Sequence, residues 1–124
     1  MRIGIVIFGH GSSVPSANEA VVRVAAEAAL AGGFALSETA FLEVSPTLRE
    51  ATAKLMQRGA EEILVIPYFL TLGIHLQRDL PRIIEELSTE FGGLRMRVTP
   101  PLDGHPALTG IIVDRVKEAM AAAV

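Results

Sequence analysis

The stretch from Ile3 to Phe8 contains no polar side chain and stops abruptly at Gly9-His10-Gly11. A short apolar run that ends in glycine, with a helix-start signal after it, is typical of a strand buried on both faces in a parallel sheet. Ligands of such sheets bind outside the carboxyl ends of the strands. The glycines leave little side-chain bulk around the histidine, so a ligand can approach it closely. The opening of the chain therefore predicts a buried strand that delivers the His10 imidazole to a binding edge.

Strand and helix patterns alternate along the whole chain, which predicts an α/β fold: a four-stranded parallel sheet with helices on both faces, three layers in all. The first helix pattern opens with Ser16-Ala17-Asn18-Glu19, which has the form of a capping box. Strands are expected over residues 3–8, 34–42, 62–69 and 94–99, and helices are expected to begin near Ser16, Pro46, His75 and Pro106. The last helix, which extends to about Ala122, is expected to turn an apolar stripe toward the sheet, made of Leu108, Ile111, Ile112 and Val116.

The overall composition excludes several classes of protein. With 124 residues, 50% of them hydrophobic and 20% charged, the chain is expected to form one domain over residues 1–124 rather than a disordered segment. A formal net charge of −3 gives no electrostatic reason to bind nucleic acid or an anionic membrane. The longest apolar stretch, from Ile63 to Ile74, is too short for a bilayer span. The absence of cysteine excludes disulfides and thiolate metal sites, and it fits a cytoplasmic protein.

All three histidines lie just beyond a predicted strand, at the same edge of the sheet. His10 follows the first strand, Glu43 the second and His75 the third, while Asp103 and His105 follow the fourth. Histidines placed for solubility or core filling would also be expected on helix surfaces or at the opposite edge. The convergence predicts a functional site at the carboxyl edge of the sheet.

Imidazole with carboxylate suits borderline divalent metals such as cobalt, nickel, iron or zinc, whereas magnesium and calcium prefer oxygen ligands. The same groups serve as acid–base catalysts near neutral pH, and both uses remain open. Each residue also has a purely structural interpretation: His10 as a helix cap or turn residue, His75 as an ordinary first-turn residue, and Glu43 as a partner for the positive end of the helix near Pro46. His105 is interpreted as a helix cap or a rim residue rather than a ligand.

A set of short motifs runs in order along the chain: Gly9-His10-Gly11-Ser12, Phe41-Leu42-Glu43, Pro67-Tyr68-Phe69-Leu70, Gly73-x-His75, Asp79-Leu80-Pro81, Pro101-Leu102-x-Gly104 and His105-Pro106. In this order and spacing they resemble the short sirohydrochlorin cobaltochelatases, the small CbiX-type members of the family that inserts a divalent metal into a tetrapyrrole. The resemblance covers the whole chain. Gly-His-Gly-Ser alone would be a weak signal, whereas the ordered set is fairly specific.

The resemblance implies a chelatase-like fold and a homodimer, because longer relatives carry two such lobes that face each other across a cleft. It aligns His10 and His75 with the family's paired metal-binding and catalytic histidines, and Glu43 with their acidic partner. The substrates it implies are a tetrapyrrole, sirohydrochlorin or a relative, and a divalent metal ion: cobalt first, nickel or iron as alternatives, with no organic cofactor. The resulting hypothesis is that His10 and His75 hold the metal, or share metal binding with removal of pyrrole protons, while Glu43 assists.

Carboxylate groups on such a substrate need binding partners of their own. The backbone N–H groups of Gly11, Ser12 and Ser13 are candidates, because they are expected at a helix N-terminus, where anions bind. Secondary candidates are the helix arginines Arg49, Arg78 and Arg82.

Two rival functions use the same features. A metal or tetrapyrrole carrier would use the pocket without turnover, and Ser13 favours it because many relatives have a basic residue at that position. Phosphoryl transfer through His10 is suggested by the histidine–glycine pair after a first strand. Histidine phosphatases, however, place an arginine before the histidine, where this chain has Gly9.

Overall fold

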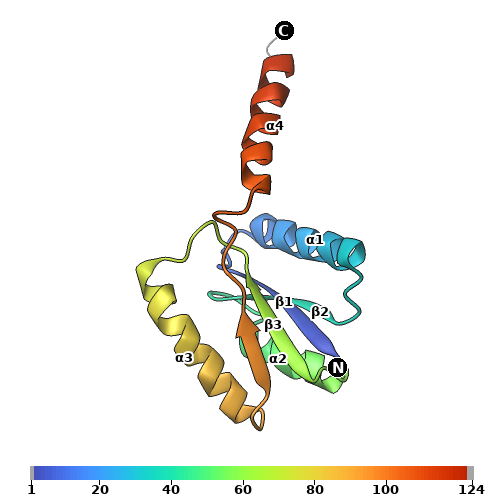
Figure 1. The fold of residues 1–124 in the computed structure, drawn as a ribbon, viewed down its shortest axis with the longest axis vertical. Helices are drawn as coiled ribbons and strands as arrows, with labels where there is room; N and C mark the ends of the chain where they lie inside the picture. The colour runs from blue at the N-terminus through green and yellow to red at the C-terminus, as the bar shows by residue number, and fades with distance from the viewer. Residues whose placement is uncertain (1, 123–124) are drawn as a thin grey trace.

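The computed structural model describes residues 2–122, whose strands form one parallel sheet in the order β2-β1-β3-β4 (Figure 1). The strands are β1 (Ile3–Gly9), β2 (Ser37–Phe41), β3 (Glu62–Pro67) and β4 (Arg95–Val98), and they alternate with α1 (Pro15–Gly32), α2 (Leu48–Gln57), α3 (Ile74–Glu90) and α4 (Ala107–Ala122). The predicted alternation and the four-stranded parallel sheet are confirmed, with element ends shifted by up to a few residues. The predicted single domain includes residues 1, 123 and 124, which lie outside the described residues.

One face of the sheet is closed by two helices, α2 and α3. Val6 of β1 and Val65 of β3 are fully buried in a cluster with Leu55 of α2, Leu80 of α3 and other apolar side chains. The two central strands supply this face because they are the most apolar ones, and burial of such side chains is the main favourable term in folding. This face therefore forms the principal core.

The opposite face carries a single helix, α1. Ile5 and Ile7 of β1 are buried against Ala25 of this helix, whereas Leu64 and Ile66 of β3 on the same face are only partly buried. The three layers are thus α1, the sheet, and α2 with α3. Figure 1 shows α4 standing clear of all three layers.

The prediction that α4 turns its apolar stripe toward the sheet is wrong. No residue of α4, which is described over its full length, is buried. The cause lies in the preceding segment, where the N–H groups of Leu102 and Asp103 donate to the carbonyls of Phe69 and Leu70 at 2.9 and 2.8 Å. These bonds hold the chain against the loop after β3, and α4 leaves from there. The stripe in question comprises Leu108, Ile111, Ile112 and Val116.

Within residues 2–122, neither α4 nor another helix is long and apolar enough to cross a membrane.

The predicted capping box at the start of α1 is also wrong. Ser16–Glu19 lies inside the helix, which begins at Pro15 without a side-chain cap, because the fixed φ of proline already suits a first helical position. Asn18 instead bonds back to Ser12: its Oδ1 accepts from the Ser12 N–H at 2.9 Å, and its Nδ2 donates to the Ser12 carbonyl at 2.8 Å. These two bonds fasten the loop that carries His10 to α1.

Candidate metal and ligand site

A cleft of about 450 Å³ opens at the carboxyl edge of the sheet. The ends of β1, β2 and β3 meet there because these strands are parallel neighbours. His10 and Glu43 reach the cleft from the loops after β1 and β2, and His75 reaches it from the first turn of α3. The rest of the lining consists of Leu42, Phe69, Gly73, Ile74, Leu76, Asp79, Arg82 and Ile83. The structure thus places all three candidate catalytic residues around one cleft.

His10 is held at the cleft by both its backbone and its ring. Its carbonyl accepts a hydrogen bond from the Glu43 N–H at 2.8 Å, which ties the loops after β1 and β2 together. Its ring packs edge-on against Phe69, with centroids 6.3 Å apart, and its Nδ1 lies 3.1 Å from the Gly11 carbonyl oxygen. A carbonyl can only accept, so Nδ1 carries the proton and the neutral ring keeps its lone pair on Nε2. Gly11 itself has φ +88°, a conformation that strongly favours glycine.

The free nitrogen of His10 faces a carboxylate. Its Nε2 lies 3.7 Å from Oε1 of Glu43, and the two side chains are 62% and 58% exposed, so an ion from solvent can reach both. An imidazole lone pair and a carboxylate oxygen 3.7 Å apart can ligate one divalent cation, because two bonds of about 2 Å span this distance with a bent angle at the ion. The pair is an open, partial metal site that leaves the remaining coordination positions to water or substrate.

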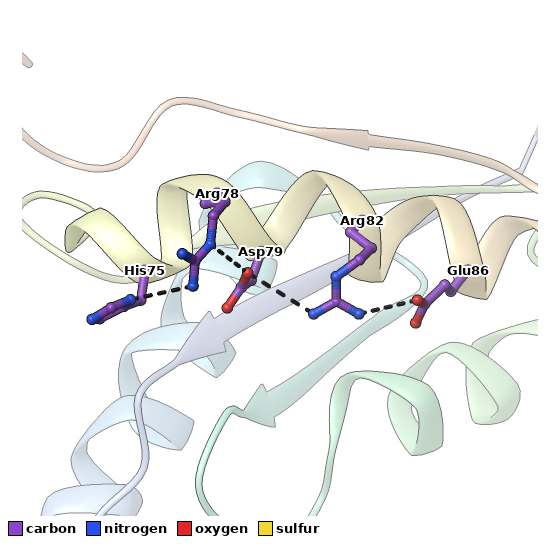
Figure 2. Close-up of polar contacts among 5 residues, drawn as sticks. All are labelled: His75, Arg78, Asp79, Arg82 and Glu86. Atoms are coloured by element: carbon purple, nitrogen blue, oxygen red, sulfur yellow. Dashed lines mark hydrogen bonds and ion pairs between the residues drawn. The ribbon is translucent and has the colours of Figure 1, made fainter.

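His75 lies in a different electrostatic environment, at the start of a row of charged side chains on α3 (Figure 2). Its Nδ1 lies 3.3 Å from Nη2 of Arg78. A guanidinium can only donate, so Nδ1 is the acceptor and the proton of the neutral ring is on Nε2. Arg78 and the N-terminus of α3 both place positive charge around this ring. His75 is therefore less suited than His10 to attract a cation.

The charged row continues from Arg78 through Asp79 and Arg82 to Glu86 (Figure 2). Arg78 Nε donates to Asp79 Oδ1 at 3.1 Å, and Arg82 lies 3.9 Å from the same oxygen while donating to Glu86 at 3.0 Å. The hydrogen bond from Arg78 is the main cause that lowers the pKa of Asp79, and the charges of Arg78 and Arg82 contribute. Asp79 and Arg82 both line the cleft, so this wall carries an ionised carboxylate and an oriented guanidinium.

The protein by itself does not gather a complete ligand set. Among residues 2–122, no three histidine, aspartate or glutamate side chains lie close enough to hold one ion. The convergence of His10 and His75 on a single metal therefore stays a prediction.

The cleft wall does not include the other candidates, namely His105, Gly11, Ser12 and Ser13. His105 Nδ1 accepts from the Ala107 N–H at 3.0 Å, so the interpretation of His105 as a helix cap is confirmed. Gly11, Ser12 and Ser13, all of them described, are not part of the cleft wall, and the Ser12 N–H is already donated to Asn18 of α1. Their role in binding a substrate carboxylate stays a prediction.

Sequence reasoning missed the apolar part of the cleft wall. Leu42 directly follows β2 and Phe69 comes two residues after β3, and both line the cleft, although Phe69 also packs against the principal core. The available signal was that the chain stays apolar where it leaves the sheet and a loop usually becomes polar. Asp79 was recognised only as part of a motif, and its contact with Arg78 was not predicted. An apolar wall with a few polar groups at its rim fits a flat, largely apolar ligand.

A parallel α/β fold with imidazole and carboxylate groups around an apolar cleft defines a class of small proteins that bind a metal ion or a flat ligand at a sheet edge. Within that class, the chain belongs to the CbiX family, whose model matches residues 4–119. The resemblance seen in the sequence is thereby confirmed.

Individual relatives agree with this assignment. The chain is 30% identical to the sirohydrochlorin cobaltochelatase of Methanopyrus kandleri over 140 residues, which cover 95% of this chain and 97% of that protein. It is 31% identical to the chloroplastic sirohydrochlorin ferrochelatase of Arabidopsis thaliana over 121 residues, which cover 94% of this chain and 52% of that protein. The crystal structure of the CbiX protein from Marinobacter aquaeolei VT8 matches with a TM-score of 0.86 at 29% identity, over 99% of this chain and 98% of that one.

Proposed function

We propose that this chain is a chelatase that inserts a divalent metal into sirohydrochlorin or a related tetrapyrrole, with cobalt first and nickel or iron as alternatives. The observation that carries the proposal is His10 Nε2 facing the Glu43 carboxylate at 3.7 Å in a partly apolar cleft. Family membership supports the reaction class, since relatives bear the names of a cobaltochelatase and a ferrochelatase of sirohydrochlorin. Mixed nitrogen and oxygen ligands suit either metal.

In this proposal, His10 and Glu43 hold the substrate metal at the mouth of the cleft. An ion bound by two protein ligands keeps open positions for water and for the incoming ring nitrogens. A closed set of protein ligands would bind more tightly and release the ion slowly. The incomplete site therefore suits an ion that must be passed on, and it favours turnover over storage.

Insertion also requires bases, because the metal replaces the inner pyrrole N–H protons. Glu43 can accept a proton as the metal leaves its carboxylate. His75 can accept the other proton at Nδ1. The lone pair of this nitrogen accepts from Arg78 in the structure and becomes free when that contact breaks. We therefore assign metal binding chiefly to His10, and proton removal to His75 with help from Glu43.

The acidic side chains of the macrocycle need cationic or N–H partners. Arg82 is the best placed of these, because it lines the cleft beside Asp79. Phe69 and the neighbouring apolar side chains would contact the flat ring. We retain the remaining sequence candidates for the outer carboxylates, namely Arg49, Arg78 and the backbone of Gly11, Ser12 and Ser13.

We further propose that residues 1–124 form one domain and that two copies of the chain form a homodimer. We propose a cytoplasmic location and assign the enzyme to the lyases. A single cleft edge leaves one side of a flat macrocycle open to water, and a second copy would cover it. The chain covers 52% of the Arabidopsis relative, so two copies match the length of one such protein. The absence of cysteine is compatible with a reducing compartment.

The direct test is to mix the protein with sirohydrochlorin and cobalt, nickel or ferrous ion and to follow the absorption change of the macrocycle. We expect acceleration over the protein-free reaction with at least one metal, and a loss of about 100-fold in His10→Ala. His105→Asn is the matched control, because it removes a histidine outside the cleft and keeps a side chain that can cap α4.

No acceleration with any of the three metals would refute the enzyme. One-to-one binding of cobalt or sirohydrochlorin without acceleration would support the carrier instead.

A further inference from the structure

The loop after β1 is fastened at Ser12 by the side chain of Asn18, in the first turn of α1. Asn18 Oδ1 accepts from the Ser12 N–H at 2.9 Å, and Asn18 Nδ2 donates to the Ser12 carbonyl at 2.8 Å. A backbone N–H can only donate and a carbonyl can only accept, so these partners fix which way the amide of Asn18 is turned. The helix is itself anchored, because Ala25 is buried against Ile5 and Ile7 of β1. Asn18 therefore holds the loop from a fixed position.

The Ser12 N–H belongs to the same planar group as the Gly11 carbonyl. The Gly11–Ser12 peptide bond is trans, and in a trans peptide the N–H and the C=O point in opposite directions. One side of this peptide thus faces Asn18. The other side faces the ring of His10, whose Nδ1 lies 3.1 Å from the Gly11 oxygen. The amide of Asn18, the peptide and the imidazole form one hydrogen-bonded chain.

Two acceptors compete for the single proton of the neutral His10 ring. The Gly11 oxygen lies 3.1 Å from Nδ1, and Oε1 of Glu43 lies 3.7 Å from Nε2. A proton on Nε2 would face the carboxylate and would occupy the lone pair that a metal ion needs. The Gly11 carbonyl keeps the proton on Nδ1 only while it points at that nitrogen. The direction of this carbonyl therefore decides whether His10 can present a lone pair beside Glu43.

The backbone at Gly11 does not fix this direction by itself. Its φ of +88° favours glycine, and an added Cβ would lie 3.0 Å from side-chain atoms of both Phe41 and Val44. Glycine has the widest conformational freedom of any residue, so the peptide after it can turn unless a partner holds it. The bond from the Val14 N–H to Ser12 Oγ, at 3.0 Å, closes the loop but does not involve the Gly11–Ser12 peptide. The contact that holds this peptide is therefore the one with α1.

We propose that Asn18 is a positioning residue for His10. Its amide orients the Gly11–Ser12 peptide, so that the Gly11 carbonyl holds the proton on Nδ1 and Nε2 presents its lone pair to the metal ion. Hydrogen bonds in a chain polarise one another, so donation of the Ser12 N–H to Asn18 also makes the Gly11 oxygen a stronger acceptor. A partner behind a metal-binding histidine fixes its tautomer and its orientation. The inference rests on His10 as a metal ligand in the proposed function, but not on turnover.

Nitrogen-15 NMR of the histidine rings tests the proposal in the unaltered chain. Spectra recorded at about pH 9, above the ordinary titration range of histidine, distinguish a protonated ring nitrogen from a bare one. We expect a protonated Nδ1 and a bare Nε2 for His10, whose signals are identified by their loss in His10→Ala. A proton on Nε2 of His10 would overturn the proposal.

Asn18→Ala should move the His10 proton toward Nε2 and weaken cobalt binding by about 10-fold in calorimetric titration, because both bonds to Ser12 are lost. Gln77→Ala is the matched control. Gln77 is an amide in the first turn of α3, and its Nε2 donates at 3.0 Å to the Leu72 carbonyl in the preceding loop. This variant should leave the His10 tautomer and the cobalt affinity unchanged.

Asn18→Asp is the conservative variant. A carboxylate oxygen can still accept from the Ser12 N–H, and an acidic residue in the first turn of a helix favours folding. The ring signals of His10 should therefore match those of the wild type. A shift of the proton to Nε2 in Asn18→Asp would overturn the proposal, and this variant together with the wild-type spectrum decides it if Asn18→Ala does not fold.

The remaining outcomes are equally decisive. A folded Asn18→Ala protein with the wild-type tautomer and cobalt affinity would overturn the proposal, and so would equal changes in Gln77→Ala. Cobalt affinity that is the same in His10→Ala and wild type would overturn it too, because His10 would then not be a ligand. Absence of chelatase activity refutes only the proposed reaction, since neither the ring signals nor the cobalt titration requires turnover.

Discussion

His10 and His75 line the same cleft, but their neighbours carry opposite charges. Nε2 of His10 lies 3.7 Å from the carboxylate of Glu43, whereas Nδ1 of His75 lies 3.3 Å from the guanidinium of Arg78. His10 sits in a loop tied to the sheet, and His75 sits at the positive end of α3 (Figure 2). We call the edge with His10 and Glu43 the cation side, and the edge with Arg78 and Arg82, which also carries ionised Asp79, the anion side.

This difference teaches that two histidines paired by a motif need not share one task. In the proposed reaction, Glu43 would attract the metal ion, and Arg78 and Arg82 would attract a carboxylate of the macrocycle. In the proposed reaction the cleft must hold both reactants at once, so separation of charge keeps them from competing for the same groups.

The largest expected effect comes from replacing the two histidines separately. His10→Ala should weaken cobalt binding by about 100-fold and lower the insertion rate by a similar factor, because it removes the lone pair that faces Glu43. His75→Ala should slow insertion by roughly 10-fold or more but change cobalt affinity by less than about threefold. Calorimetric titration with cobalt and initial rates measure the two effects. Equal losses of cobalt affinity in both variants would break the comparison.

Glu43→Gln should have the next largest effect. The amide keeps the shape of the side chain and removes its charge, so cobalt affinity should fall by roughly 10-fold while affinity for the metal-free macrocycle stays nearly constant. Titrations of each ligand separately provide the measurement. A larger loss of affinity for the macrocycle than for cobalt would place Glu43 on the anion side.

Arg78→Gln should have a smaller effect, confined to the anion side. We expect the KM for sirohydrochlorin to rise by about threefold, with cobalt affinity unchanged or slightly tighter, because positive charge beside His75 is lost. Arg115→Gln is the matched control, since Arg115 is also an exposed helix arginine, pairs with Glu118 at 2.9 Å and is not part of the cleft wall. The same rise in KM in both variants would contradict a local role for Arg78.

The smallest expected effect is on the pKa of Asp79 and on the pH dependence of folding stability that follows from it. Arg78 holds the pKa of Asp79 below its ordinary value, so ionised Asp79 stabilises the folded chain above the pKa of the unfolded state. That contribution is lost as pH falls through the lowered folded-state value. Arg78→Gln should therefore raise the Asp79 pKa in a carboxyl NMR titration, and the stability difference from wild type should be larger at pH 7 than at about pH 3. An unchanged Asp79 titration in Arg78→Gln would contradict the role of Arg78 in lowering the Asp79 pKa.

Much of the fold and of the site was predictable because short stretches of sequence show where strands and helices alternate. Apolar strands alternating with helices predict a parallel sheet, and in such a sheet the loops that bear His10, Glu43 and His75 share one edge. The contact between His75 and Arg78 could also have been predicted, since side chains three residues apart are neighbours on a helix. The partnership of Glu43 with the histidines was implied only by the family resemblance, because its 3.7 Å approach to His10 depends on β2 pairing with β1.

The amino-acid sequence by itself determined the order of the elements, the family and the residues that reach the carboxyl edge. These follow from apolar periodicity, glycine and proline positions and motif spacing, all of which act over short stretches of chain. Only the tertiary structure decided the strand order, the separation of a cation side from an anion side and the departure of α4 from the sheet. Each of these depends on contacts between distant segments, which the pattern of a short stretch of sequence does not contain.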